Sequence, residues 1–166
     1  MRRAGGLTDE KLARLAGLAL FRRCSERELV TLGRLAEEVR VPAGTRLQTE
    51  DAPGRSWWVL LDGSAAVSRG GWPTALFGPG DFWGEAALVS GQPASVTVVT
   101  LSPSVLFTFD RRSFLGALHQ LPVVSMALLQ VMAEWEPRYG QPAARRVTRP
   151  GRDPNVATER PGSHSH

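Results

Sequence analysis

The chain has 166 residues, of which 42% are hydrophobic, and a single cysteine. A chain of this length buries one sizeable core, so we expect one domain with tails rather than two full domains. The lone Cys24 excludes an internal disulfide framework and a cysteine-based zinc cluster, and it favours a reducing, cytoplasmic location.

The formal net charge of +4 comes from the C-terminal segment. Residues 137–166 contain six arginines against Asp153 and Glu159, whereas basic and acidic side chains balance over residues 1–136. Because the segment is rich in proline and glycine and poor in large apolar residues, we expect residues 136–166 to form a disordered basic tail. We interpret it as a solvated tail; the alternative is a basic arm that contacts nucleic acid, an anionic membrane surface or an acidic partner.

The sequence shows neither a signal peptide nor a membrane span. Asp9 and Glu10 follow the N-terminal arginines at the point where the apolar part of a signal peptide would begin. The longest nearly apolar run, residues 123–133, is shorter than the roughly 20 residues that cross a bilayer. We therefore expect a soluble protein.

Two helices are predicted near the N-terminus. Thr8 is a capping residue in an N-terminal extension, residues 1–17, and the helix after it places Leu12 and Leu15 on one side. The second helix has a stronger start signal, because residues 25–28, Ser-Glu-Arg-Glu, form a capping box ahead of leucines at helical spacing.

The middle of the chain changes to short β-like runs that are separated by glycine, at residues 39–41, 46–49, 56–61, 64–68, 95–101 and 105–110. Asp62-Gly63 lies between two apolar runs and predicts a two-residue hairpin. Short strands without alternating helices indicate antiparallel sheets in a sandwich, roll or barrel. The expected fold class is therefore mainly β with flanking helices.

Two helices are also predicted after the strands. Asp110 caps a short one, and Pro122 begins another that ends near Trp135. The second of these is apolar on all sides, so we expect both the protein's own core and a partner helix to cover it. We predict a homodimer, or a complex with another protein, through Val124, Leu128, Val131 and Trp135.

A set of glycines and their neighbours recurs at defined intervals: Pro42, Gly44, Leu47, Gly54, Trp58 to Leu60, Gly63, Val67, Gly78 to Phe82, Gly84, Glu85, Ala87 and Leu88. Their order and spacing resemble the cyclic nucleotide-binding domain, the sensor module of CRP/FNR-type regulators, protein kinase A regulatory subunits and cyclic nucleotide-gated channels. The resemblance covers about residues 18–135. It implies an antiparallel β-roll of the double-stranded β-helix or jelly-roll type.

The resemblance also implies a phosphate-binding cassette on residues 84–98. Gly84 would begin a short helix whose backbone N–H groups, near Glu85 and Ala86, face the phosphate of cAMP or cGMP. Glu85 would accept a hydrogen bond from the ribose 2′-hydroxyl, and Ser95 would donate one to a phosphate oxygen.

One position departs from this pattern, because Ala94 stands where family members that bind cyclic nucleotide tightly have arginine. Losing that cation typically weakens binding by about 2–5 kcal/mol. Val96, where the family prefers alanine, adds bulk and is expected to narrow the pocket. Two interpretations stay open: weak or altered nucleotide binding, or a fold that has lost its nucleotide.

Other residues near the roll have plainer interpretations. Trp57, Trp58, Trp72 and Trp83 could stack on a base, but in strands next to Val and Leu they are expected to be core or strand-pair aromatics. Arg55 and Arg69 are expected on the surface, where neither replaces the missing cation.

We expect a regulatory module and not an enzyme, with no cofactor and no metal site. The first hypothesis is a weak sensor of cAMP or cGMP; the second is a scaffold that binds partners through its last helix or its tail. A third, nucleic-acid binding, depends on the tail alone. The residues after Trp135 are broken by proline and predict no winged helix-turn-helix, so we expect no sequence-specific DNA binding. The sequence identifies no particular ligand, partner or pathway.

Overall fold

The computed structural model describes residues 1–4 and 6–134. In chain order its elements are β1 (Arg2–Ala4), α1 (Asp9–Ala16), the 3-10 helix η1 (Ala19–Phe21), α2 (Glu26–Leu35), β2 (Glu37–Val41), β3 (Arg46–Gln48), β4 (Ser56–Asp62), β5 (Ala65–Arg69), β6 (Trp72–Phe77), β7 (Phe82–Trp83), α3 (Glu85–Ser90), β8 (Thr97–Thr100), β9 (Ser104–Asp110), α4 (Arg111–Gln120) and α5 (Pro122–Glu134).

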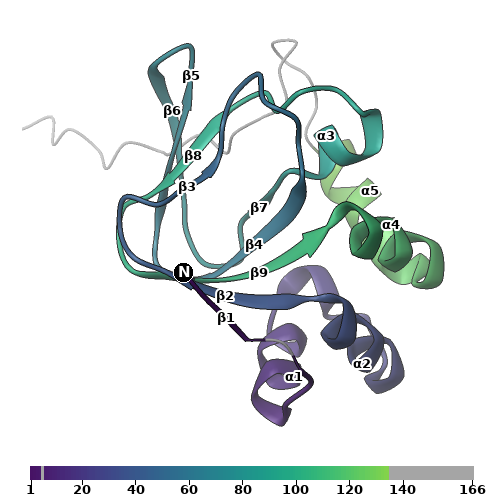
Figure 1. Ribbon diagram of the computed structural model, residues 1–166. Coiled ribbons are helices and arrows are strands. Elements are labelled where there is room, and N and C mark those ends of the chain that lie inside the picture. The colour runs from purple at the N-terminus through teal and green to yellow at the C-terminus, as the bar shows by residue number, and fades with distance from the viewer. Residues whose placement is uncertain (5, 135–166) are drawn as a thin grey trace, which may run out of the picture.

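The strands form two antiparallel sheets, one in the order β1-β2-β9-β4-β7 and the other in the order β3-β8-β5-β6. Figure 1 shows the sheets curled into a roll, with α1 and α2 at one end and α4 and α5 beside it. The predicted fold class, mainly β with flanking helices, is confirmed.

Strand alternation divides the core into two clusters. In β4, Trp57 and Val59 pack with the helices, whereas Leu60 on the opposite face packs inside the roll. Strand β9 alternates in the same way, with Phe107 toward the helices and Leu106 toward the roll. Both faces of these two strands are buried because side chains alternate across a sheet, which explains their nearly continuous apolar sequences.

The predicted helix caps are confirmed. Thr8 accepts a hydrogen bond from the backbone N–H of Lys11 at 3.1 Å. Ser25 and Glu28 exchange the two bonds of a capping box, at 3.2 and 2.6 Å. Asp110 accepts from the N–H of Ser113 at 2.7 Å. Each cap satisfies a free N–H group of the first helical turn.

The hairpin predicted at Asp62-Gly63 is wrong, because β4 and β5 belong to different sheets and do not pair. Gly63 (φ 98°) instead turns the chain from one sheet to the other. The two-residue hairpin lies between β5 and β6, at Gly70 and Gly71, whose φ angles of 55° and 79° suit a type I′ turn.

The N-terminal extension contributes more than the expected helix, because β1 pairs with β2 at the edge of the first sheet. In α1, which follows β1, the side chain of Lys11 is only 3% exposed. Its ammonium group donates hydrogen bonds to the carbonyl oxygens of Ala36 and Gly6. The buried cation therefore ties α1 to the end of α2 and to the segment before α1.

In helix α5, two of the residues that were predicted to form a dimer contact lie in the protein's own core. Val124 and Leu128 are 0% and 4% exposed and belong to the protein's own core, since α5 packs on η1 and α4. Val131 is half-buried, and Trp135 lies outside the described residues, as does the predicted tail. The apolar side chains that α5 exposes are Met126, Leu129 and Met132.

Within the described part of the chain, no single helix has the length and apolar composition needed to cross a membrane. Helices α4 and α5 pass that test only as a pair, and they are bent by 104° relative to each other.

Candidate functional site

Helix α3 begins at a glycine that the fold requires. Gly84 has φ 96° and caps α3, and a Cβ at this position would lie 2.3 Å from the carbonyl oxygen of Ser56 in β4. Gly54 makes a second close approach, because its Cβ would lie 2.4 Å from the Cβ of Ala87. Both glycines therefore allow α3 to pack directly against β4 and the turn before it.

The loop after α3 is fixed by backbone hydrogen bonds to the turn at residues 51–53. Ala94 donates its N–H to the carbonyl of Ala52, and its own carbonyl accepts from Asp51, both at 2.9 Å. Pro53 and Pro93 form an isolated antiparallel bridge beside them. The backbone N–H of Ala94 is therefore occupied and is not free to donate to a ligand.

Helix α3 and its loop enclose a cavity of about 230 Å³ against the inside of the roll. The cavity is lined by Gln48, Val67, Phe77, Phe82, Trp83, Gly84, Glu85, Ala86, Ala87, Ser90, Gln92, Pro93, Ala94, Ser95 and Val96. All five predicted site residues (Gly84, Glu85, Ala86, Ala94 and Ser95) are among them. The structure thus brings the predicted residues together around one space, which stays open although Val96 lines it.

Glu85 is the ionisable residue of this cavity. Its side chain is 7% exposed, and burial raises the pKa of its carboxyl group to about 7. A hydrogen bond from its own backbone N–H lowers the pKa and offsets part of this shift. The Oε2 atom is buried and has no hydrogen-bond partner among the described residues. A buried acceptor without a partner is costly, and a ligand that donates a hydrogen bond would satisfy it.

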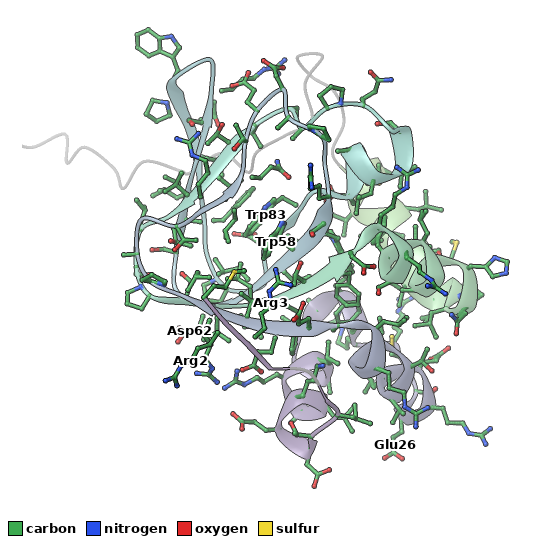
Figure 2. The ribbon with its side chains drawn as sticks, viewed as in Figure 1. Arg2, Arg3, Glu26, Trp58, Asp62 and Trp83 are labelled. Carbon is green, nitrogen blue, oxygen red and sulfur yellow. The ribbon has the colours of Figure 1, made fainter. Side chains whose placement is uncertain are left out.

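An aromatic stack lies beside the cavity, and two of its rings, Phe77 and Trp83, line the cavity. The ring centroids of Phe77 and Trp83 are 5.1 Å apart, and those of Trp83 and Trp58 are 6.4 Å apart. In each pair the rings are stacked, with 16° between their planes. Figure 2 shows Trp58 and Trp83 close together within the roll. The indole Nε1 of Trp83 is buried, and it has no hydrogen-bond partner in the described part of the protein.

The other tryptophans divide between core and surface. Trp57 is fully buried at the centre of the helix-side core, as predicted. Trp72 is in a strand pair, as predicted, since it lies opposite Arg69 of β5, but its side chain is 77% exposed because it begins β6 directly after the Gly70-Gly71 turn.

Among the described residues, no cation lines the cavity. None of the described residues that line it is lysine, arginine or histidine, so Glu85 is its sole charged side chain. Arg55 is exposed and Arg69 half-buried, and neither lines the cavity. The described residues also contain no cluster of His, Cys, Asp and Glu that would hold a metal ion.

Sequence reasoning did not identify two features of the site. It favoured Trp83 as a core or strand-pair aromatic over a ring that stacks on a base, and it did not include Phe77, yet both residues line the cavity. Their proximity to Glu85 depends on the pairing of β7 with β4 and on the curl of the second sheet. The only local signal was that Trp83 comes two residues before Glu85.

Comparison with protein families agrees with this geometry. The model of the family described as "Cyclic nucleotide-binding domain" matches residues 38–120. A cyclic nucleotide-gated potassium channel of Mesorhizobium japonicum is 33% identical over 100 residues, which cover 60% of this chain and 28% of the channel. The chain therefore spans less than a third of the length of this relative.

Solved structures share the fold at lower identity. The regulatory domain of Toxoplasma gondii PKA, in a co-crystal with cAMP, is 17% identical with a TM-score of 0.66, over 76% of this chain and 49% of that one. The Catabolite Activator Protein of Thermus thermophilus is 24% identical with a TM-score of 0.63, over 69% of this chain and 56% of that one.

Proposed function

Because the chain belongs to the cyclic nucleotide-binding domain family, we propose that it is a regulatory module whose cavity at Glu85 binds a cyclic nucleotide weakly. One observation carries this proposal: the described residues that line the open cavity include Glu85, whose buried Oε2 has no hydrogen-bond partner among them, and include no basic side chain. The open space favours a retained ligand site over a pocket filled by its own side chains. The missing cation favours low affinity.

The size of the loss follows from the charge of the ligand. A cyclic nucleotide carries one negative charge on its phosphate, and removing the partner of a desolvated charge costs about 2–5 kcal/mol. That cost corresponds to a weakening of roughly 30- to 5,000-fold. The same ligand still offers a ribose hydroxyl to Glu85 and a base to the aromatic rings that line the cavity.

The test compares the wild-type chain with Ala94→Arg. The side chain of Ala94 is 3% exposed and lines the cavity, so an arginine here can extend toward a bound phosphate. We expect millimolar cAMP or cGMP to raise the unfolding midpoint of Ala94→Arg clearly and that of wild type slightly, because a ligand that binds the folded state stabilises it. Val89→Arg, which puts the same charge on an exposed residue of α3 that does not line the cavity, is the matched control. No shift in either the wild type or Ala94→Arg would contradict the proposal.

We propose that α5 is the output element of the module. Leu88 of α3 and Leu128 of α5 belong to one core cluster, so a ligand that repositions α3 changes the packing beneath α5. The response is then an equilibrium between two states that the ligand binds with different affinity.

The exposed face of α5 supports a homodimer as the second part of this proposal. Met126 and Leu129 are 56% and 58% exposed, and Met132 continues the same apolar surface. Light scattering at micromolar concentration should give the mass of a dimer for wild type and of a monomer for Leu129→Glu. A monomeric wild type would contradict dimerisation and leave the ligand proposal intact.

A further inference from the structure

We propose that the cavity prefers an uncharged aromatic nucleoside to a cyclic nucleotide. This inference depends on the proposed function in one respect, that the cavity at Glu85 is the ligand site. It concerns the charge of the ligand, and it follows from the charge, the unpartnered polar atoms and the size of the cavity.

The charge of the cavity disfavours an anion. Among the described residues that line it, Glu85 is the only charged side chain, and none is a cation that would balance a phosphate. A phosphodiester bound there would lose its water without gaining a counter-charge, and it would lie in the same small space as a carboxylate. A nucleoside has the same sugar and base and has no charge to desolvate.

The unpartnered polar atoms suit a neutral ligand. Glu85 Oε2 is a buried acceptor and Trp83 Nε1 is a buried donor, and both residues line the cavity without a hydrogen-bond partner in the described part of the chain. A ribose hydroxyl donates to a carboxylate, and a heteroaromatic base carries ring nitrogens or carbonyl oxygens that accept from an indole N–H. Neither contact requires a phosphate.

The aromatic rings that line the cavity support a flat ligand. Phe77 and Trp83 are stacked with 16° between their planes, and they line the cavity together with the apolar Val67 and Val96. Aromatic rings bind other rings in stacked or edge-on arrangements. A purine base therefore suits these rings better than a purely aliphatic ligand does.

The size of the cavity sets an upper limit on the ligand. Its volume of about 230 Å³ exceeds that of the roughly 150 Å³ cavity that takes up one benzene ring. It lies below the roughly 300–1,000 Å³ typical of pockets for drug-sized molecules. A single nucleoside matches this range better than a dinucleotide or a nucleoside triphosphate.

The test measures four affinities on the full chain by isothermal titration calorimetry, with adenosine, guanosine, cAMP and cGMP as ligands. For wild type we expect the better nucleoside to bind at least about tenfold more tightly than the corresponding cyclic nucleotide, the equivalent of a difference of about 1.4 kcal/mol. In Ala94→Arg the order should reverse, because the added guanidinium favours the anion and not the nucleoside.

Two further variants test the contacts. Glu85→Gln removes the carboxylate and should weaken nucleoside binding more than cyclic nucleotide binding, since it also removes the repulsion of the anion. Trp83→Phe keeps a ring and removes the N–H group, and it should weaken nucleosides and cyclic nucleotides alike, because both carry the base that accepts from the indole. Circular dichroism of each variant checks that it folds, and the wild-type comparison does not depend on either variant.

The outcomes separate this inference from the proposed function. If wild type binds cAMP or cGMP as tightly as the nucleosides, or more tightly, the inference is wrong and the proposed function stands. If wild type binds none of the four ligands, both are wrong. A preference for a nucleoside that Ala94→Arg leaves unchanged would also overturn the inference, because charge would then not be its cause.

Discussion

Two buried ionisable side chains, Lys11 and Glu85, differ in what surrounds them. The ammonium group of Lys11 donates to the carbonyls of Ala36 and Gly6, which join α1 to neighbouring segments. Glu85 faces a cavity, and its Oε2 has no partner among the described residues. A buried charge whose partners belong to the fold stabilises the fold, whereas an unpartnered charge beside a cavity is the basis of the ligand site that we propose.

The pKa shifts express the same difference. Burial lowers the pKa of Lys11, but the nearby carboxylates of Glu38 and Glu37 act in the opposite direction and favour the charged form. Burial raises the pKa of Glu85 to about 7, and only its own backbone N–H opposes that shift. Lys11 is therefore compensated by neighbouring side chains, and Glu85 is not.

The largest expected effect is the pH dependence of stability caused by Glu85. Its pKa rises from an ordinary 4.5 to about 7 on folding, so the folded state binds more protons than the unfolded state between these values. The free energy of unfolding should then fall by about 3 kcal/mol as the pH rises through this interval, and stay low above it. Glu85→Gln should remove this dependence and be more stable than wild type at pH 8.

Chemical denaturation at a series of pH values measures both chains. Because other carboxylates titrate in the acid range, the difference between the two curves isolates the contribution of Glu85. A difference that stays constant from pH 5 to pH 8 would show that Glu85 is solvated or paired, and the contrast with Lys11 would fail.

The next effect concerns the glycine that holds Glu85 in place. Gly84→Ala forces a side chain into positive φ and against the Ser56 carbonyl, so we expect it to destabilise the protein by about 2–3 kcal/mol. Gly91→Ala is the matched control, because Gly91 also has positive φ (70°) but its Cβ would meet nothing within 4 Å. The control should cost about 1 kcal/mol. Equal losses in the two variants would mean that α3 is not packed tightly on β4.

The smallest expected effect concerns Lys11, the buried charge whose partners belong to the fold. Lys11→Met keeps an unbranched stem in the same space but leaves the carbonyl of Ala36 without its ammonium donor. We expect a loss of about 1–2 kcal/mol, which is opposite in sign to the effect of Glu85→Gln at pH 8. Lys11→Arg, which keeps the charge and the donors, should recover part of the loss. A stabilised Lys11→Met would contradict the structural role of Lys11.

Much of the local structure could be predicted because its signals are local. The caps at Thr8, Ser25 and Asp110 each need only a side chain and the next turn of backbone. The glycine spacing identified the family and placed residues 84–98 at the site. The replacement at Ala94 could also be seen, since it is one position in a recognisable motif.

Long-range relations could not be predicted in the same way. Asp62-Gly63 has the composition of a hairpin, but the choice of sheet for β5 depends on its pairing with β8, which lies about 30 residues away. Val124 and Leu128, which were predicted to lie in a dimer contact, face the core because α5 packs on η1. The periodicity of the sequence alone does not show this packing. Whether another basic residue replaced the missing arginine could be decided only from the lining of the cavity.

The titration of the Glu85 carboxyl group, followed by NMR through its side-chain carbon and assigned with Glu85→Gln, tests the central claim most directly. The free protein should titrate with a pKa of about 7. Saturating adenosine should lower that pKa, because a ribose hydroxyl that donates to the carboxylate favours its charged form. A pKa near the ordinary 4.5 in the free protein, or a raised pKa that adenosine leaves unchanged, would contradict the claim that Glu85 is a buried acceptor awaiting a ligand.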